Sequence, residues 1–235
     1  MIHALHGNFG LPTDWTAALP AHLPATTYHL WQIRRHHSET HTLTGFAKWL
    51  NPQIAALPPD PHRLLIGYSL GGRLALHLIA DRPDLWPRAL LLSTHPGLTS
   101  NVNRTARLVH DAAWKTRCLT TPLPALLDAW HAQPVLSSNI PSTPPDPLAP
   151  WLPEIADAFT GWSLGLQADH LPLLAPLPTT GLWLTGANDL KFNALAEQAT
   201  RTLPHFTHQT IPHSGHRLLT DQPLAVSSAI LQLLS

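Results

Sequence analysis

Residues 63–80 read RLLIGYSLGGRLALHLIA, and this stretch decides the fold class. Residues 63–68 have the apolar composition of a buried strand, and residues 70–80 have that of a helix. The turn between them matches G-x-S-x-G, in which glycines permit a bend too tight for side chains. The motif alone occurs by chance in many proteins. Its place between a strand and a helix predicts that Ser69 is a nucleophile at the head of a sheet.

Apolar strands alternate with amphipathic helices on both sides of this stretch, as is typical of a parallel sheet covered on both faces. We expect strands at residues 2–5, 26–33, 63–68, 88–93, 181–185 and 206–211. We expect helices at residues 13–23, 42–57, 70–80, 193–203 and 223–234, with Thr13 as the N-cap of the first. The pattern predicts an α/β-hydrolase fold with a mostly parallel sheet of about six strands.

Residues 98–176 contain helical pieces without convincing strands, and prolines crowd into residues 122–178. We interpret residues 98–176 as a helical, proline-rich cap over the C-terminal edge of the sheet, where ligands bind in open α/β sheets. Residues 1–97 and 177–235 would then form the hydrolase core.

The composition excludes several classes of partner. Charged residues make up 12% of the 235 residues, and 14 Lys and Arg balance 14 Asp and Glu. A net charge of zero gives no electrostatic reason to expect nucleic acid or an anionic membrane. Cys118 is the single cysteine, no apolar run approaches the ~18 residues of a membrane span, and no signal peptide is visible. We expect a cytoplasmic protein, either a monomer or a homodimer.

A serine nucleophile needs a base, and the base needs an orienting acid. In this fold the chain order is Ser, then Asp or Glu, then His. Asp189 follows the strand expected at 181–185, and His216 follows the last strand in the segment His213-Ser214-Gly215-His216. We predict a triad of Ser69, Asp189 and His216. His213 is the alternative base, and Asp189 could instead be a turn or helix-cap residue.

The segment His6-Gly7-Asn8-Phe9-Gly10 follows the first expected strand. Glycines there let backbone amides turn inward, so the N–H groups of Asn8 and Leu70 are the predicted oxyanion donors.

No cofactor or metal is expected. The pair His205 and His208 has no carboxylate or third ligand at a familiar spacing, so we interpret both as surface histidines. The glycines of GYSLGG do not fit a dinucleotide-binding pattern. Cys118 has no surrounding motif, which favours a structural role over that of a nucleophile.

Three longer stretches carry a resemblance beyond the general fold. They are GYSLGGR at 67–73, HPGL at 95–98 with LTTPLPALLDAWHAQPV at 119–135, and GANDLKF at 186–192. With them the chain resembles the 2-succinyl-6-hydroxy-2,4-cyclohexadiene-1-carboxylate synthase family of menaquinone biosynthesis. The resemblance implies a lyase step in which a ring proton is removed and pyruvate is expelled. It implies that Ser69 acts in proton abstraction with His216 behind it, held by Asp189, without a cofactor.

The resemblance also implies a small anionic substrate that needs cations to hold its carboxylates. Its expected contacts are Tyr68, Arg73, Arg107, Trp130 and Lys191. For Tyr68 and Trp130 the competing interpretation is core packing. For the three cations it is that each is a solvated surface charge. Between Cys118 and Leu190 the chain has no Lys or Arg, so a further cap arginine of the family has no counterpart. The family's usual first hairpin also has no counterpart, so we expect a sheet shorter by about two strands.

The triad alone does not separate a lyase from a serine carboxylesterase, thioesterase or C–C bond hydrolase on the same scaffold. A non-enzymatic protein on a hydrolase fold is disfavoured because every triad and oxyanion element is present.

Overall fold

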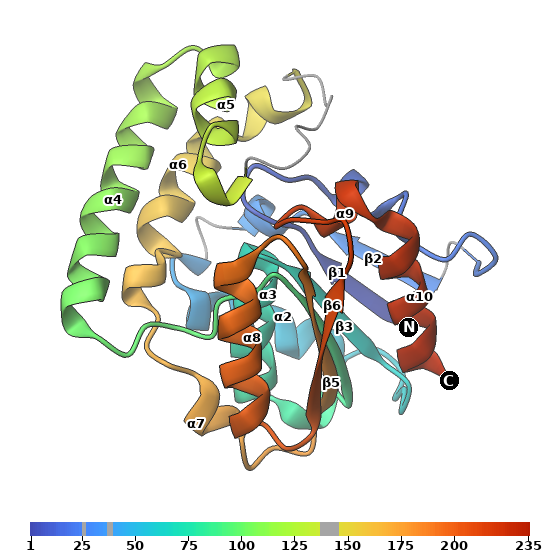
Figure 1. Ribbon diagram of the computed structural model, residues 1–235. Helices are drawn as coiled ribbons and strands as arrows, with labels where there is room; N and C mark the ends of the chain where they lie inside the picture. Colours follow the sequence, from blue (N-terminus) through green and yellow to red (C-terminus); the bar gives the residue numbers. More distant parts are fainter. Residues whose placement is uncertain (25–26, 37–39, 137–145) are drawn as a thin grey trace.

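The computed structural model describes residues 1–24, 27–36, 40–136 and 146–235. Six parallel strands form one sheet in the order β2-β1-β3-β4-β5-β6 (Figure 1). The strands are β1 (Ile2–Leu5), β2 (Tyr28–Trp31), β3 (Leu64–Tyr68), β4 (Arg88–Leu92), β5 (Thr180–Gly186) and β6 (Phe206–Ile211). The expected parallel sheet of about six strands is confirmed.

Both faces of the sheet are covered, because successive side chains of a strand point to opposite faces. In β3, Leu65 packs with α2 (Leu43–Ala55), α3 (Leu70–Asp81) and α8 (Leu190–Thr202). Leu64 and Ile66 pack on the other face with η1 (Pro12–Trp15), α9 (Leu218–Asp221) and α10 (Pro223–Leu234). Two apolar layers therefore hold the strands rigidly in register.

The chain changes direction across the sheet between β1 and β3. From β1 it moves outward to β2, and it then returns to pair β3 with the other edge of β1. In open α/β sheets such a switch point leaves a crevice outside the carboxyl ends of the two strands. The segments that leave β1 and β3 are those that contain Asn8 and Ser69.

A group of helices between β4 and β5 lies together at one end of the molecule, beyond the sheet (Figure 1). Its elements are α4 (Asn101–Thr120), α5 (Leu123–His131), η5 (Pro134–Leu136), η6 (Asp146–Trp151) and α6 (Leu152–Gly161). Residues of α4, α5, η6 and α6 share an apolar cluster around Trp114, Ile155 and Phe159, which also takes in Phe9 and Leu11 from the loop after β1. We call α4, α5, η5, η6 and α6 the cap helices.

The segment that follows the cap helices returns to the core. It forms η7 (Leu164–Leu166) and α7 (Leu171–Leu174), and Leu171 and Leu174 pack into the cluster beneath the sheet. The division into a core of residues 1–97 and 177–235 and a cap of residues 98–176 stays a prediction.

One expected helix is wrong. Residues 13–23 were expected to form a helix capped by Thr13, but only the 3₁₀ turn Pro12–Trp15 forms there. Pro20 lacks the N–H that a longer helix would need at that position. The remaining connections are η3 (Ile33–His36) and η4 (Pro83–Leu85). In the described parts of the chain, no helix has the length and apolar character needed to span a membrane.

Candidate active site

Ser69 lies in a strained turn between β3 and α3. Its φ of 52° is in the left-handed region, which L residues with side chains rarely adopt. The turn is tight because a Cβ atom at Gly67 would lie 2.6 Å from the carbonyl oxygen of Gly71. The Ser69 N–H donates to the carbonyl of Leu92 in the neighbouring strand at 2.9 Å. The tight turn and this hydrogen bond place Ser69 at the N-terminus of α3.

Ser69, His216 and Asp189 form a continuous hydrogen-bonded chain. His216 Nε2 lies 3.2 Å from Ser69 Oγ, and His216 Nδ1 lies 2.7 Å from Asp189 Oδ2. A neutral imidazole with its proton on Nδ1 donates to the carboxylate and accepts from the serine hydroxyl. His216 and Asp189 are only 4% and 7% exposed, so the pair is shielded from bulk water. The arrangement can take a proton through the serine oxygen.

Asp189 also begins α8. Its Oδ1 accepts a 3.5 Å hydrogen bond from the Phe192 N–H, so it is the N-cap residue of that helix. Asp189 therefore has the contact expected of a triad acid and also the contact expected of a helix-cap residue. His213, the alternative base, is exposed and is not among the residues that line the cavity beside Ser69.

The loop after β1 is held by buried polar contacts. His6 Nδ1 lies 2.9 Å from the carbonyl oxygen of Gly7 and Nε2 lies 2.9 Å from Gln32 Oε1. Complete burial lowers the pKa of His6 to about 3, so the ring is neutral. The guanidinium of Arg34 donates to the carbonyl of Gly10. These contacts hold Asn8 beside Leu70 and Ser69 in the wall of one cavity.

That cavity has a volume of about 750 Å³ and lies between the sheet edge and the cap helices. Its lining includes every predicted site residue other than Asp189, which lies behind His216: Asn8, Tyr68, Ser69, Leu70, Arg73, Arg107, Trp130, Lys191 and His216. Trp130 packs on Phe9 with ring centres 4.7 Å apart and on Trp114 at 5.0 Å. Trp130 therefore packs in the apolar cluster of the cap helices and also forms part of the cavity wall.

The three predicted cations are held by different partners. Arg73 is buried, and it donates to Gln167 Oε1 at 2.6 Å and to the carbonyl of Trp162 at 2.8 Å. Burial, with the charge of Arg107, lowers the pKa of Arg73 to about 9, so the guanidinium is charged at neutral pH. Arg107 Nε donates to Asp111 at 2.7 Å. Burial and the charge of Arg107 also lower the pKa of Lys191.

Several functional candidates escaped the sequence analysis. Asp111 is 1% exposed, and besides Arg107 it accepts a 2.7 Å hydrogen bond from Ser163. Its spacing four residues after Arg107 was the available signal, since such pairs meet on one helix face. Arg217 also lines the cavity. It directly follows His216, but adjacency in sequence does not say which way a side chain points.

Within the described residues, no three His, Cys, Asp or Glu side chains are grouped as a metal site would require. The expectation that no cofactor is needed stays a prediction. Cys118 is buried in the cap cluster, and burial raises the pKa of its thiol to about 11. The thiol is therefore protonated and packed, as a structural role requires.

Comparisons with known proteins agree with this geometry. Residues 4–229 match the Alpha/beta hydrolase family. The chain is 31% identical to the 2-succinyl-6-hydroxy-2,4-cyclohexadiene-1-carboxylate synthase of Pectobacterium atrosepticum, over 98% of this chain and 92% of that protein. It is 33% identical to the protein of the same name from Photorhabdus laumondii, over 73% of this chain and 62% of that protein. The structure of MenH from S. aureus aligns with a TM-score of 0.80, covering 99% of this chain and 92% of that one, at 18% identity.

Proposed function

The chain belongs to the 2-succinyl-6-hydroxy-2,4-cyclohexadiene-1-carboxylate synthase family of alpha/beta hydrolases, and on this premise we propose that it is a pyruvate-eliminating lyase. Its substrate is 2-succinyl-5-enolpyruvyl-6-hydroxy-3-cyclohexene-1-carboxylate, and its product is 2-succinyl-6-hydroxy-2,4-cyclohexadiene-1-carboxylate. The observation that carries the proposal is that Ser69 and His216, which is hydrogen-bonded to Asp189, share one cavity with the cations Arg73, Arg107 and Lys191.

The chemistry begins at the ring carbon next to the succinyl carbonyl. His216 accepts the Ser69 hydroxyl proton as Ser69 Oγ removes the ring proton, and the imidazolium is stabilised by Asp189. Negative charge then spreads onto the succinyl oxygen, which the N–H groups of Asn8 and Leu70 stabilise. The electrons form a double bond between C2 and C3, the C3–C4 double bond of the substrate shifts to C4–C5, and the bond from C5 to the enolpyruvyl oxygen breaks. Enolpyruvate leaves, and its methylene carbon takes up a proton that replaces the one removed from C2, which gives pyruvate.

The substrate is anionic, and the charges in the cavity wall support this choice. Arg73, Arg107 and Lys191 present positive charge beside Ser69. Arginine forks bind carboxylates through two parallel hydrogen bonds, which orients the bound group as well as attracting it. The reaction requires no cofactor, and we propose a cytoplasmic location on the sequence grounds given above.

The test is pyruvate release from the enolpyruvyl-bearing cyclohexene, measured with wild type and Ser69→Ala side by side. We expect rapid release by the wild type and a loss of about a thousandfold or more in the variant, by analogy with other triad serines. Circular dichroism and thermal unfolding of the variant check that its fold is intact.

Two outcomes would overturn this proposal. If the wild type releases no pyruvate above background yet cleaves p-nitrophenyl esters, the protein is a serine hydrolase. If the variant releases pyruvate as fast as the wild type, Ser69 has no part in the chemistry.

A further inference from the structure

Arg217 introduces a fourth cation into the cavity wall. It is 5% exposed and comes from the segment between His216 and α9. Asp14, Tyr68 and Thr220 line the cavity with it. Burial lowers the pKa of Arg217 below its usual range, while Tyr68 and the nearby Asp221 act against that shift.

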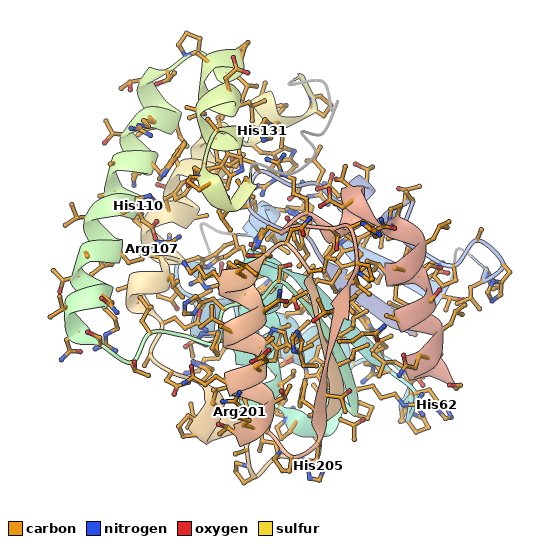
Figure 2. All side chains as sticks on the ribbon, viewed as in Figure 1. His62, Arg107, His110, His131, Arg201 and His205 are labelled. Carbon is orange, nitrogen blue, oxygen red and sulfur yellow. The ribbon has the colours of Figure 1, made fainter. Side chains whose placement is uncertain are left out.

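The cap helices after Cys118 have no cation of their own to offer. Between Cys118 and Leu190 the sequence contains no Lys or Arg. In the described cavity wall, Arg107 on α4 is a cation of the cap helices, and near α5 the positive charge comes from the core. Arg217 supplies it and reaches the cap, because its Nη2 lies 2.5 Å from Nδ1 of His131 at the end of α5. Figure 2 shows His131 on α5 and Arg107 on α4.

His131 is a neutral partner. Burial and the charge of Arg217 lower the pKa of His131, so at neutral pH its Nδ1 accepts the hydrogen bond from the guanidinium. An imidazole of this kind orients a guanidinium without cancelling its charge.

The cations fall into two groups by the residues that they contact. Arg73 donates to the carbonyl of Trp162, and Asp111, the partner of Arg107, accepts from the adjacent Ser163. The charge of Arg107 also lowers the pKa of Lys191, whereas Arg217 contacts His131 on α5. Arg217 is acted on instead by Tyr68 and Asp221. Asp14 lies in the same wall, and its Oδ2 accepts a 3.0 Å hydrogen bond from the Leu11 N–H.

We propose that Arg217, oriented by His131, binds one carboxylate of the substrate while Arg73, Arg107 and Lys191 bind another. The ligand class is an organic dicarboxylate or tricarboxylate whose anionic groups lie too far apart for one cation group to hold. This inference rests on the proposed function in one respect, since that substrate carries three carboxylates.

The experiment measures binding rather than turnover. The probe is 2-succinylbenzoate, a stable aromatic dicarboxylate with the same succinyl group, titrated calorimetrically into wild type, Arg217→Gln and Arg217→Lys. Its dimethyl ester is the uncharged comparison. Arg201→Gln is the matched control, because Arg201 is 78% exposed on α8, far from the cap helices (Figure 2).

We expect Arg217→Gln to weaken binding of the dicarboxylate by about 10- to 100-fold, the loss typical of a charged hydrogen-bonded pair. Arg217→Lys should recover part of it, and the control should bind as the wild type does. Binding of the dimethyl ester should be the same in all four proteins. His131→Leu should weaken dicarboxylate binding less than Arg217→Gln, and His131→Gln, which keeps an acceptor, should restore it.

Three results would overturn the inference. They are unchanged dicarboxylate binding in Arg217→Gln, an equal loss for the dimethyl ester, and no measurable binding to the wild type at millimolar probe. The proposed lyase is judged separately. Pyruvate release with an unchanged KM in Arg217→Gln would refute only the role of Arg217, whereas Arg217-dependent binding without pyruvate release would refute only the lyase.

Discussion

The two carboxylate oxygens of Asp189 have different partners. Oδ2 accepts from His216, and Oδ1 accepts from the Phe192 N–H at the start of α8. Asparagine is as good an N-cap as aspartate, but it cannot stabilise an imidazolium. The two tasks can therefore be separated by one substitution.

We expect Asp189→Asn to lower kcat for pyruvate release by about a thousandfold or more while leaving the free energy of unfolding nearly unchanged. The amide favours the wrong imidazole tautomer and offers no charge to the protonated ring. Steady-state kinetics and urea unfolding measure the two quantities. Asp84→Asn, on the exposed turn after α3, is the control. A loss of stability matching the loss of activity would count against a catalytic role.

At the scale of elements, aromatic side chains join the cap helices to the loop after β1. Phe159 of α6 stacks on Trp114 of α4 with ring centres 6.0 Å apart. It also contacts Trp130 at 5.8 Å and Phe9 at 6.0 Å. Phe9 follows Asn8, so the packing of α6 bears on the predicted oxyanion donor. The cap helices are thus part of the cavity wall and also pack against the loop after β1.

We expect Phe159→Ala to cost about 3–5 kcal/mol of unfolding free energy, because it leaves a cavity among three aromatic rings. Pyruvate release should fall as well, since the Phe9 loop loses its support. Urea unfolding and kinetics check both effects. Leu119→Ala, at a position 62% exposed on α4, should change stability by less than about 0.5 kcal/mol. Equal costs for the two variants would contradict this account.

Across the whole molecule, buried neutral histidines couple the fold to pH. Burial lowers the pKa of His3, His6, His77 and His95 to about 3. In the unfolded chain each would titrate near about 6.5. Below that pH these histidines bind protons in the unfolded state but stay neutral in the folded state. The free energy of unfolding therefore keeps its full value above pH ~6.5 and decreases as the pH falls toward ~3.

We expect the free energy of unfolding to fall steeply between about pH 6.5 and 4.5, by up to about 1.4 kcal/mol per pH unit for each buried histidine. Urea unfolding at a series of pH values gives the slope. His77→Asn should reduce that slope by about one proton even if it lowers stability at pH 8. His205→Gln, at an exposed position, should leave it unchanged. A midpoint independent of pH in this range would refute the explanation.

Most of the fold could be predicted from the local sequence pattern of the chain. The strand at β3, the turn at Ser69 and the helix α3 follow from apolar runs and glycines within 18 neighbouring residues. The triad candidates followed from their positions after strands, because parallel strands present their carboxyl ends at one edge. The helix expected over residues 13–23 does not form, because Pro20 has no N–H to donate within a helix, and the prediction gave this too little weight.

Only the tertiary structure decided which side chains meet. His216 Nε2 and Ser69 Oγ are 147 positions apart in sequence and 3.2 Å apart in space. The choice of His216 over His213, and the partnerships of Asp111 with Ser163 and of Arg217 with His131, depend on the direction of side chains from packed elements. Sequence by itself determined the fold class and the family, since both depend on local periodicity and short motifs. The charges of the cavity depend on burial and on long-range contacts, which exist only after the chain has folded.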